Sequence, residues 1–192
     1  MAESTLRHEE RIALARLHAL LELLPTALDK ELSPAGLTSF EFTLLEALSE
    51  AEEQRLRLSA LASRTNATLP RLSRVVTGLE RKGLVRKAPC PEDGRATNAR
   101  LTEEGLGVYR SSRARYDSAV RRMILDGLDE RGVAQLTELT YAILTKLDPD
   151  APKRIIGGEG SEDESRGADP MPPPACPADP APEPACPADP AK

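Results

Sequence analysis

Residues 79–105 read LERKGLVRKAPCPEDGRATNARLTEEG, and this stretch decides the fold. Gly83 follows an amphipathic helix pattern and is placed to end that helix as a left-handed cap. Two extended segments come next, Leu84–Lys87 and Thr97–Leu101, and the residues between them, Pro89–Gly94, are rich in turn formers. The stretch therefore predicts a β-hairpin with a long tip, set between two helices.

The segment before the hairpin predicts a helix-turn-helix. Apolar residues recur at three- and four-residue steps over 72–79, which indicates a helix with one buried side. Thr68 is placed to cap this helix, and Pro70 is tolerated in its first turn. Upstream, Ser59 is placed to cap a short helix, and Arg64–Ala67 is typical of the turn between the two helices.

Another helix and a short strand are expected before this unit. Thr38 and Glu41 fit a capping box at the start of a helix, and Arg55–Leu58 alternates polar and apolar residues as a very short strand. The chain begins with a long amphipathic helix over 12–28, which Pro25 would kink or divide.

Two more helices follow the hairpin, with Thr102 and Asp129 placed to cap them. Like the helix over 12–28, they carry apolar stripes wider than one surface helix needs.

The composition divides the chain into a body and a tail. Residues 148–192 hold 12 of the 17 prolines and no aromatic residue, and their net charge is −6, whereas residues 1–147 have a net charge of +1. A segment of that composition cannot bury a core. We therefore expect one domain over 1–147 and a disordered, Pro-rich acidic tail over 148–192.

Several classes of protein are excluded by these patterns. No apolar run approaches the roughly 18 residues of a membrane span. The first residues carry no secretory signal, and three cysteines make no disulfide framework. We expect a cytoplasmic protein that does not bind a membrane. The two histidines accompany no nucleophile motif, phosphate loop or metal constellation, so we expect no enzyme, no catalytic residue, no cofactor and no metal site.

Positive charge is concentrated around the hairpin. Residues 64–100 hold nine basic and three acidic residues, for a net charge of +6. Such a footprint attracts phosphate and releases counterions, so we expect double-stranded DNA as a partner. The candidate contacts on the helix before the hairpin are Thr68, Pro70, Arg71, Ser73 and Arg74. The same pattern also fits a solvated basic face on an ordinary helix, and the hairpin behind it favours DNA.

Four motifs in this order resemble the MarR family of bacterial winged-helix regulators. Leu79–Arg86 is similar to its LexxGLVxR, Asp93–Ala96 to its wing-tip DxRA, Leu101–Gly105 to its LTxxG, and Leu58–Ala62 to the LxxLA of the helix before recognition. The resemblance covers roughly residues 5–147. It implies a mainly α-helical winged helix-turn-helix with a small β-wing, which forms a homodimer through its first, fifth and sixth helices.

The resemblance also implies roles for single residues. Arg95 would enter the minor groove from the wing tip, where a narrow groove concentrates negative potential. Asp93 would hold Arg95 by a salt bridge, although it also fits a plain turn residue. Arg86 would contact or orient the wing and the DNA backbone.

Members of this family often bind small aromatic or phenolic anions in a crevice between the dimer helices and the DNA-binding lobe. Arg16, His18, Arg113 and Tyr116 are the candidates to line such a crevice, and a surface or core role fits each of them as well. Cys90 lies in the wing and fits a bystander thiol.

We therefore expect a ligand-responsive transcriptional repressor that binds a pseudo-palindromic operator as a homodimer, with a DNA-binding lobe at about 38–101. The alternative is a helical protein–protein adaptor that kept the scaffold and lost DNA binding. The net charge of residues 64–100 argues against it. We also hypothesise that the anionic tail competes with DNA phosphate, against the alternative of an inert solubilising tail.

Overall fold

The computed structural model describes residues 5–90 and 93–150. The predicted tail therefore lies outside the described residues, except for its first three, and the division of the chain at residue 148 stays a prediction. The elements, in chain order, are α1 (His8–Leu32), η1 (Ser33–Ala35), α2 (Ser39–Ser49), η2 (Glu52–Gln54), β1 (Arg55–Arg57), α3 (Leu58–Arg64), α4 (Leu69–Arg81), β2 (Val85–Cys90), β3 (Asp93–Leu101), α5 (Glu103–Val120), η3 (Arg121–Leu125) and α6 (Glu130–Leu147).

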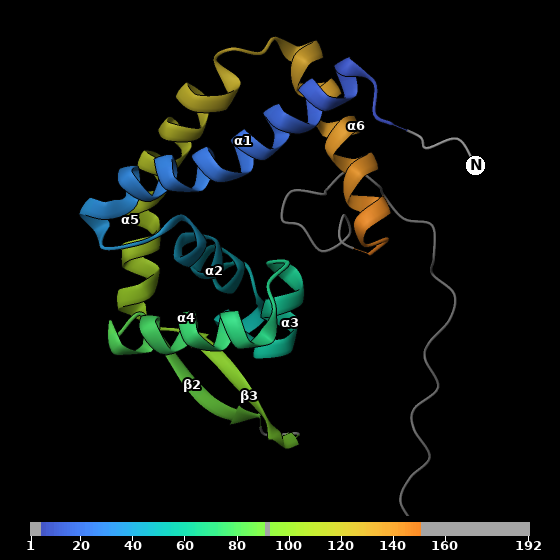
Figure 1. The fold of residues 1–192 in the computed structure, drawn as a ribbon. Helices are drawn as coiled ribbons and strands as arrows, with labels where there is room; N and C mark the ends of the chain where they lie inside the picture. The colour runs from blue at the N-terminus through green and yellow to red at the C-terminus, as the bar shows by residue number, and fades with distance from the viewer. Residues whose placement is uncertain (1–4, 91–92, 151–192) are drawn as a thin grey trace, which may run out of the picture. The chain divides into compact units, whose positions relative to one another are not determined.

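The described part is mainly α-helical with a small β-sheet, as the sequence predicts. The sheet is antiparallel, with strand order β1-β3-β2. Helix α2 lies at the centre, because it packs against α1, α3, α5 and β3. Its buried residues include Phe42, Leu44, Leu45 and Leu48. Figure 1 shows α4 on one side of α2 and α1 on the other, with the β2–β3 hairpin beyond α4.

Helix caps set the ends of several of these elements. Thr38 Oγ1 accepts a hydrogen bond from the Glu41 amide at 3.2 Å, and the Glu41 carboxylate accepts one from the Thr38 amide at 2.9 Å, so the predicted capping box is confirmed. Thr102 and Asp129 cap α5 and α6. Their side-chain oxygens accept hydrogen bonds from the amides of Gly105 and Gly132, three residues later in the chain. Gly83 has a φ of 77°, the left-handed conformation that ends α4.

Pro25 lies inside α1, so of the two expected outcomes it does not divide this helix. The expectation for the start of α3 is wrong. Ser59 does not cap α3, because β1 runs directly into this helix and Arg57, the last strand residue, occupies the cap position. The extended backbone of Arg57, with ψ of 142°, serves both elements at once.

The hairpin has longer strands and a shorter tip than the sequence predicts. Pairing continues from Val85↔Leu101 to Pro89↔Thr97 and Cys90↔Asp93, with a register shift between Pro89 and Cys90. Strand β2 is at the edge of the sheet, where a proline can continue a strand because its missing N–H removes no inner hydrogen bond.

The turn after α4 is clamped by the start of α5. Thr102 Oγ1 donates a hydrogen bond to the Gly83 carbonyl oxygen at 2.8 Å, and the Thr102 amide donates to the Leu84 carbonyl oxygen at 3.1 Å. Gly105 is buried directly beneath Leu84, where a Cβ atom would overlap the Leu84 carbonyl oxygen and lie 2.9 Å from the Leu101 side chain. A glycine at this position lets the helix and the hairpin approach each other.

We expect Gly105→Ala to lower the free energy of unfolding by at least about 2 kcal/mol, since overpacking against backbone cannot relax cheaply. Gly107→Ala is the matched control, because a Cβ there meets no atom within 4 Å. That variant should gain about 0.5–1 kcal/mol from helix propensity. Urea denaturation of both variants measures the difference, and equal stabilities would contradict this account of the clamp.

Candidate nucleic-acid interface

Helix α4 has one buried and one exposed side, as predicted. Leu72, Val76 and Leu79 are buried in the core. Exposed or half-buried side chains make up the rest of the helix surface and include the predicted contacts Thr68, Pro70, Arg71, Ser73 and Arg74, followed by Thr77 and Arg81.

Thr68 occupies the N-cap position of α4, but its hydroxyl makes no capping hydrogen bond. The prediction that its side chain caps the helix is therefore wrong. An N-cap side chain bonds the amide of the second or third helical residue, and here the second residue is Pro70, which has no N–H. The start of α4 thus leaves an exposed hydroxyl and uncapped amide groups, which are donors suited to phosphate.

The arginines of α4 differ in what holds them. The guanidinium of Arg71 lies over the ring of Phe40, 4.4 Å from the ring centroid, a cation–π contact with α2. Arg74 and Arg81 donate from Nε to carbonyl oxygens of their own helix at 3.4 Å, which is a weak contact. These two side chains keep most of their N–H donors available on an exposed surface.

Among the basic residues of 64–100 whose side chains the structure describes, three take part in ion pairs within the fold. Lys82 Nζ lies 2.7 Å from the Glu41 carboxylate and also donates to the Gly36 carbonyl oxygen. Arg64 pairs with Glu50 at 2.6 Å.

Lys87 is the third. It pairs with Glu80 at 2.9 Å, and its hydrogen bonds lower the pKa of the Glu80 carboxyl. From the sequence alone, all nine basic residues were expected to attract DNA phosphate, because no local pattern shows which of them form ion pairs.

The wing residues are placed by their backbone. Arg86 is exposed on β2, and Asp93 and Arg95 belong to β3. The side chains of Cys90, Asp93 and Arg95 lie outside the described part of the structure, so the predicted salt bridge and the groove contact stay predictions.

The four predicted ligand residues come from two helices, α1 and α5, and their joint role stays a prediction. Arg16 and His18 are exposed on α1, and no hydrogen bond or ion pair within the described part joins them to α5. On α5, Tyr116 stacks on Phe42 with ring centroids 4.3 Å apart, and burial raises the pKa of its phenol.

Arg113 belongs to a polar network that joins α2 to α5. It donates to the Tyr109 hydroxyl at 2.6 Å and pairs with the carboxylates of Glu46 at 3.0 Å and Asp117 at 3.1 Å. Burial raises the pKa of the Glu46 carboxyl, and the nearby Arg113 charge opposes that shift. Sequence reasoning missed Glu46, because nothing local marks a residue on α2 as a partner of α5.

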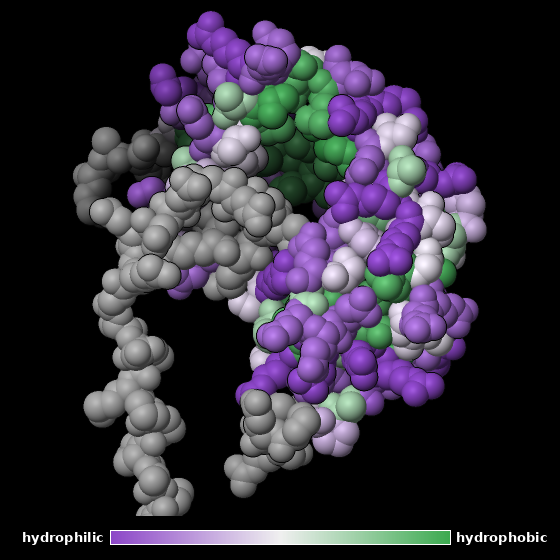
Figure 2. All heavy atoms as spheres, turned by 180° about the vertical axis from the view of Figure 1, so that it is seen from behind, coloured by the Kyte–Doolittle hydropathy of each residue, from purple (hydrophilic) through white to green (hydrophobic). Residues whose placement is uncertain are grey.

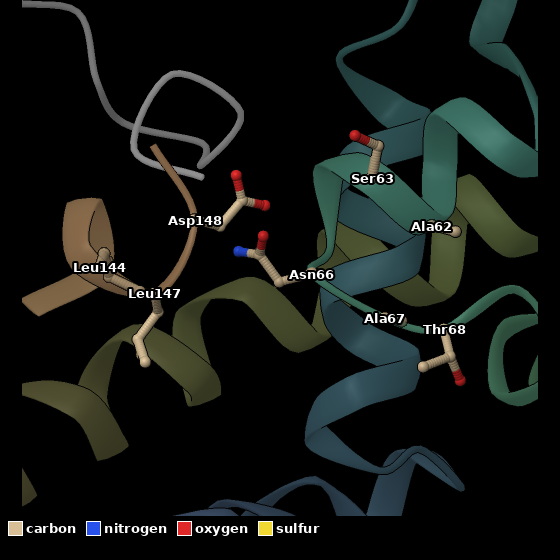
Figure 3. Close-up of a pocket in the computed structure, with 8 residues that line it drawn as sticks. All are labelled: Ala62, Ser63, Asn66, Ala67, Thr68, Leu144, Leu147 and Asp148. Atoms are coloured by element: carbon tan, nitrogen blue, oxygen red, sulfur yellow. The ribbon is translucent and has the colours of Figure 1, made fainter. Parts of the chain in front are cut away.

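An open pocket of about 420 Å³ lies between the end of α6 and the turn that joins α3 to α4. Its lining consists of Ala62, Ser63, Asn66, Ala67, Thr68, Leu144, Leu147 and Asp148, and it includes none of the four predicted ligand residues. Figure 3 shows the Asn66 and Asp148 side chains facing each other across this space. The end of α6 and the start of α4 thus line the same pocket.

Two further properties concern the described residues only. Within 5–90 and 93–150, no three or more His, Cys, Asp or Glu side chains are placed to hold a metal ion. None of the helices in those ranges has the length and apolar character needed to cross a membrane.

Comparison with known proteins identifies relatives with the same fold. Residues 35–96 match the model of the MarR family. The chain is 34% identical to AbsC, a MarR family transcriptional regulator from Streptomyces coelicolor, with a TM-score of 0.71 over 76% of this chain and 98% of that one. It is also 34% identical to Sco3205, a MarR family regulator from the same organism solved in complex with DNA, with a TM-score of 0.73 over 76% and 91%.

A curated relative is similar over a shorter range. The transcriptional repressor IacR of Pseudomonas putida is 30% identical over 94 residues, which are 47% of this chain and 54% of the relative. This chain thus spans about half the length of the curated relatives it matches. The two solved structures are covered almost completely at 34% identity, so the chain belongs to the MarR family of transcriptional regulators.

Proposed function

We propose that this chain is a transcriptional repressor that binds a pseudo-palindromic DNA operator as a homodimer. The observation that carries the proposal is the exposed face of α4, where Arg74 and Arg81 have no ion-pair partner among the described residues. An arginine in that state can pair bidentately with guanine or with phosphate. Two relatives support the proposal, since Sco3205 was solved in complex with DNA and IacR is a repressor.

The proposed contacts divide by type. Arg71 and Arg74 reach base edges in the major groove, while Thr68 and Ser73 bind backbone phosphates beside the start of α4. Arg95 enters the minor groove from the wing tip and Asp93 holds Arg95 by a salt bridge, while Arg86 contacts or orients the wing and the DNA backbone. Stacking on Phe40 limits the rotamers of Arg71, so this side chain loses less entropy on binding than a free arginine would.

The proposed dimer rests on apolar surface that the described residues of one chain do not bury. Helix α6 has no buried residue, and Leu139, Ile143 and Leu147 are 64%, 45% and 78% exposed. In α1 the buried residues are confined to its C-terminal part. Figure 2 shows apolar side chains gathered in a recess at the end of the molecule that carries α6 and the start of α1. Contiguous apolar surface of this kind marks a protein–protein interface.

The proposed ligand response acts through the network on α5. An aromatic or phenolic anion that pairs with Arg113 and packs on Tyr116 would compete with Glu46, and so would loosen the contact between α2 and α5. Since α2 belongs to the proposed DNA-binding lobe and α5 is one of the proposed dimer helices, this contact couples the two parts. A ligand that prefers a dimer with wrongly spaced α4 helices would release the operator. Arg16 and His18 would contribute from α1.

We expect Arg74→Ala and Arg95→Ala each to weaken operator binding by about 1–3 kcal/mol, which is typical of a lost groove contact. Arg110→Ala is the control, because it removes the same charge from an exposed position on α5. The measurement is a fluorescence titration of duplex DNA from the region beside the chain's own gene. If the unaltered chain binds no duplex at physiological salt, the adaptor function replaces the repressor function.

We expect Ile143→Asp to abolish the dimer or the fold, because a charge placed in a packed apolar interface costs several kcal/mol. Ala134→Asp adds the same charge on the opposite side of α6 and should leave the dimer intact. Analytical ultracentrifugation at micromolar concentration distinguishes the two states. An unaltered chain that sediments as a monomer would rule out the proposed assembly.

A further inference from the structure

The small sheet carries a row of three arginines on neighbouring strands. The register places Arg55 of β1 opposite Arg100 of β3, and Arg100 opposite Arg86 of β2. All three side chains are exposed. Since paired strands lie about 4.8 Å apart, the three side chains start within about 10 Å of one another.

The row lies on the face of the sheet that points away from the core. Val85, Ala99 and Leu101 are buried, and residues alternate between the faces of a strand, so Arg86 and Arg100 point to the other side. Lys87, the neighbour of Arg86, points to the core side and pairs with Glu80 of α4. The arginine row is therefore separate from the exposed face of α4.

The fold alone does not compensate this charge. Like charges directly opposite each other destabilise a sheet. Arg55 pairs with Glu53 at 3.0 Å, whereas Arg86 and Arg100 have no ion pair with any described residue. On the same face, Asn98 is 5% exposed, and its Oδ1 atom has no hydrogen-bond donor within the described part of the chain. A sheet face with this unfavourable arrangement is typical of a binding surface rather than of a structural one.

We propose that the arginine row binds phosphates of the DNA backbone outside the segment that α4 and the wing tip contact. The inference rests on the proposed function. Its geometry follows from the hairpin, because Arg86 lies four residues before the end of β2, or about 13 Å from it. The minor groove is about 7.5 Å deep. With the end of β2 at the floor of the groove, the arginine row therefore lies about 6 Å outside it. An extended arginine side chain can span that distance to the phosphates beside the groove.

The experiment uses the full chain with Arg55→Gln and Arg100→Gln combined. Binding is titrated at several salt concentrations against two duplexes, one trimmed to end at the base pairs that the wing tip contacts and one with about one helical turn of extra DNA on each side. On the long duplex we expect roughly tenfold weaker binding at low salt, and a salt-dependence slope smaller by at least about 1. On the trimmed duplex the double variant should bind like the unaltered chain.

The control combines Arg110→Gln and Arg115→Gln, which remove the same charge from exposed positions on α5. This control should bind both duplexes normally. Thermal unfolding of the single variant Arg100→Gln gives a readout that a structural role would not produce. This variant removes both like-charge contacts of the row and leaves the Arg55–Glu53 pair in place, so its melting temperature should rise. A lower melting temperature in Arg100→Gln would assign the row to structure and overturn the proposal.

The remaining outcomes separate this inference from the proposed function. If the unaltered chain binds both duplexes and the Arg55/Arg100 variant matches the α5 control on the long one, the arginine row does not bind DNA and the repressor function stands. If the unaltered chain binds neither duplex, both the repressor function and this inference are wrong.

Discussion

The close contact between the first turn of α5 and the turn after α4 holds the DNA-binding lobe together. Thr102 bonds the backbone of Gly83 and Leu84, and Gly105 lets the helix pass beneath the Leu84 carbonyl group. Through this contact the end of α4, the start of β2 and the start of α5 share one rigid junction. The recognition helix, the hairpin and the long helix that leads toward α6 are therefore positioned relative to one another by backbone packing, which tolerates little change in residue size.

The distribution of cations follows from that junction. Lys82 and Lys87 flank it and take part in ion pairs that fix α4 to α2 and to β2. The arginines nearer the start of α4 and those on the outer face of the sheet take no part in these two ion pairs and are exposed to solvent. One segment of high positive charge thus contains two kinds of residue, those that hold the lobe together and those that remain available to bind an anion.

The helices and the hairpin were predictable from the sequence because their signals are local. The capping box of Thr38 and Glu41, the caps Thr102 and Asp129, and the left-handed Gly83 each depend on residues within one turn. Expectations failed where a neighbouring element decides the outcome, as for Ser59 beside β1.

The candidate interface was only partly predictable for the same reason. The exposed face of α4 follows from its periodicity. Strand register and helix packing bring together residues that are far apart in the chain. Examples are the Arg71–Phe40 stack, the Glu46–Arg113 pair and the row of Arg55, Arg100 and Arg86.

The central claim is that two copies of the chain present α4 to successive major grooves. Its most direct test is the selection of binding sites from a pool of random duplexes. The account predicts an inverted repeat whose half-sites lie about 10 base pairs apart; recovery of no enriched sequence, or of a single unrepeated half-site, would contradict it.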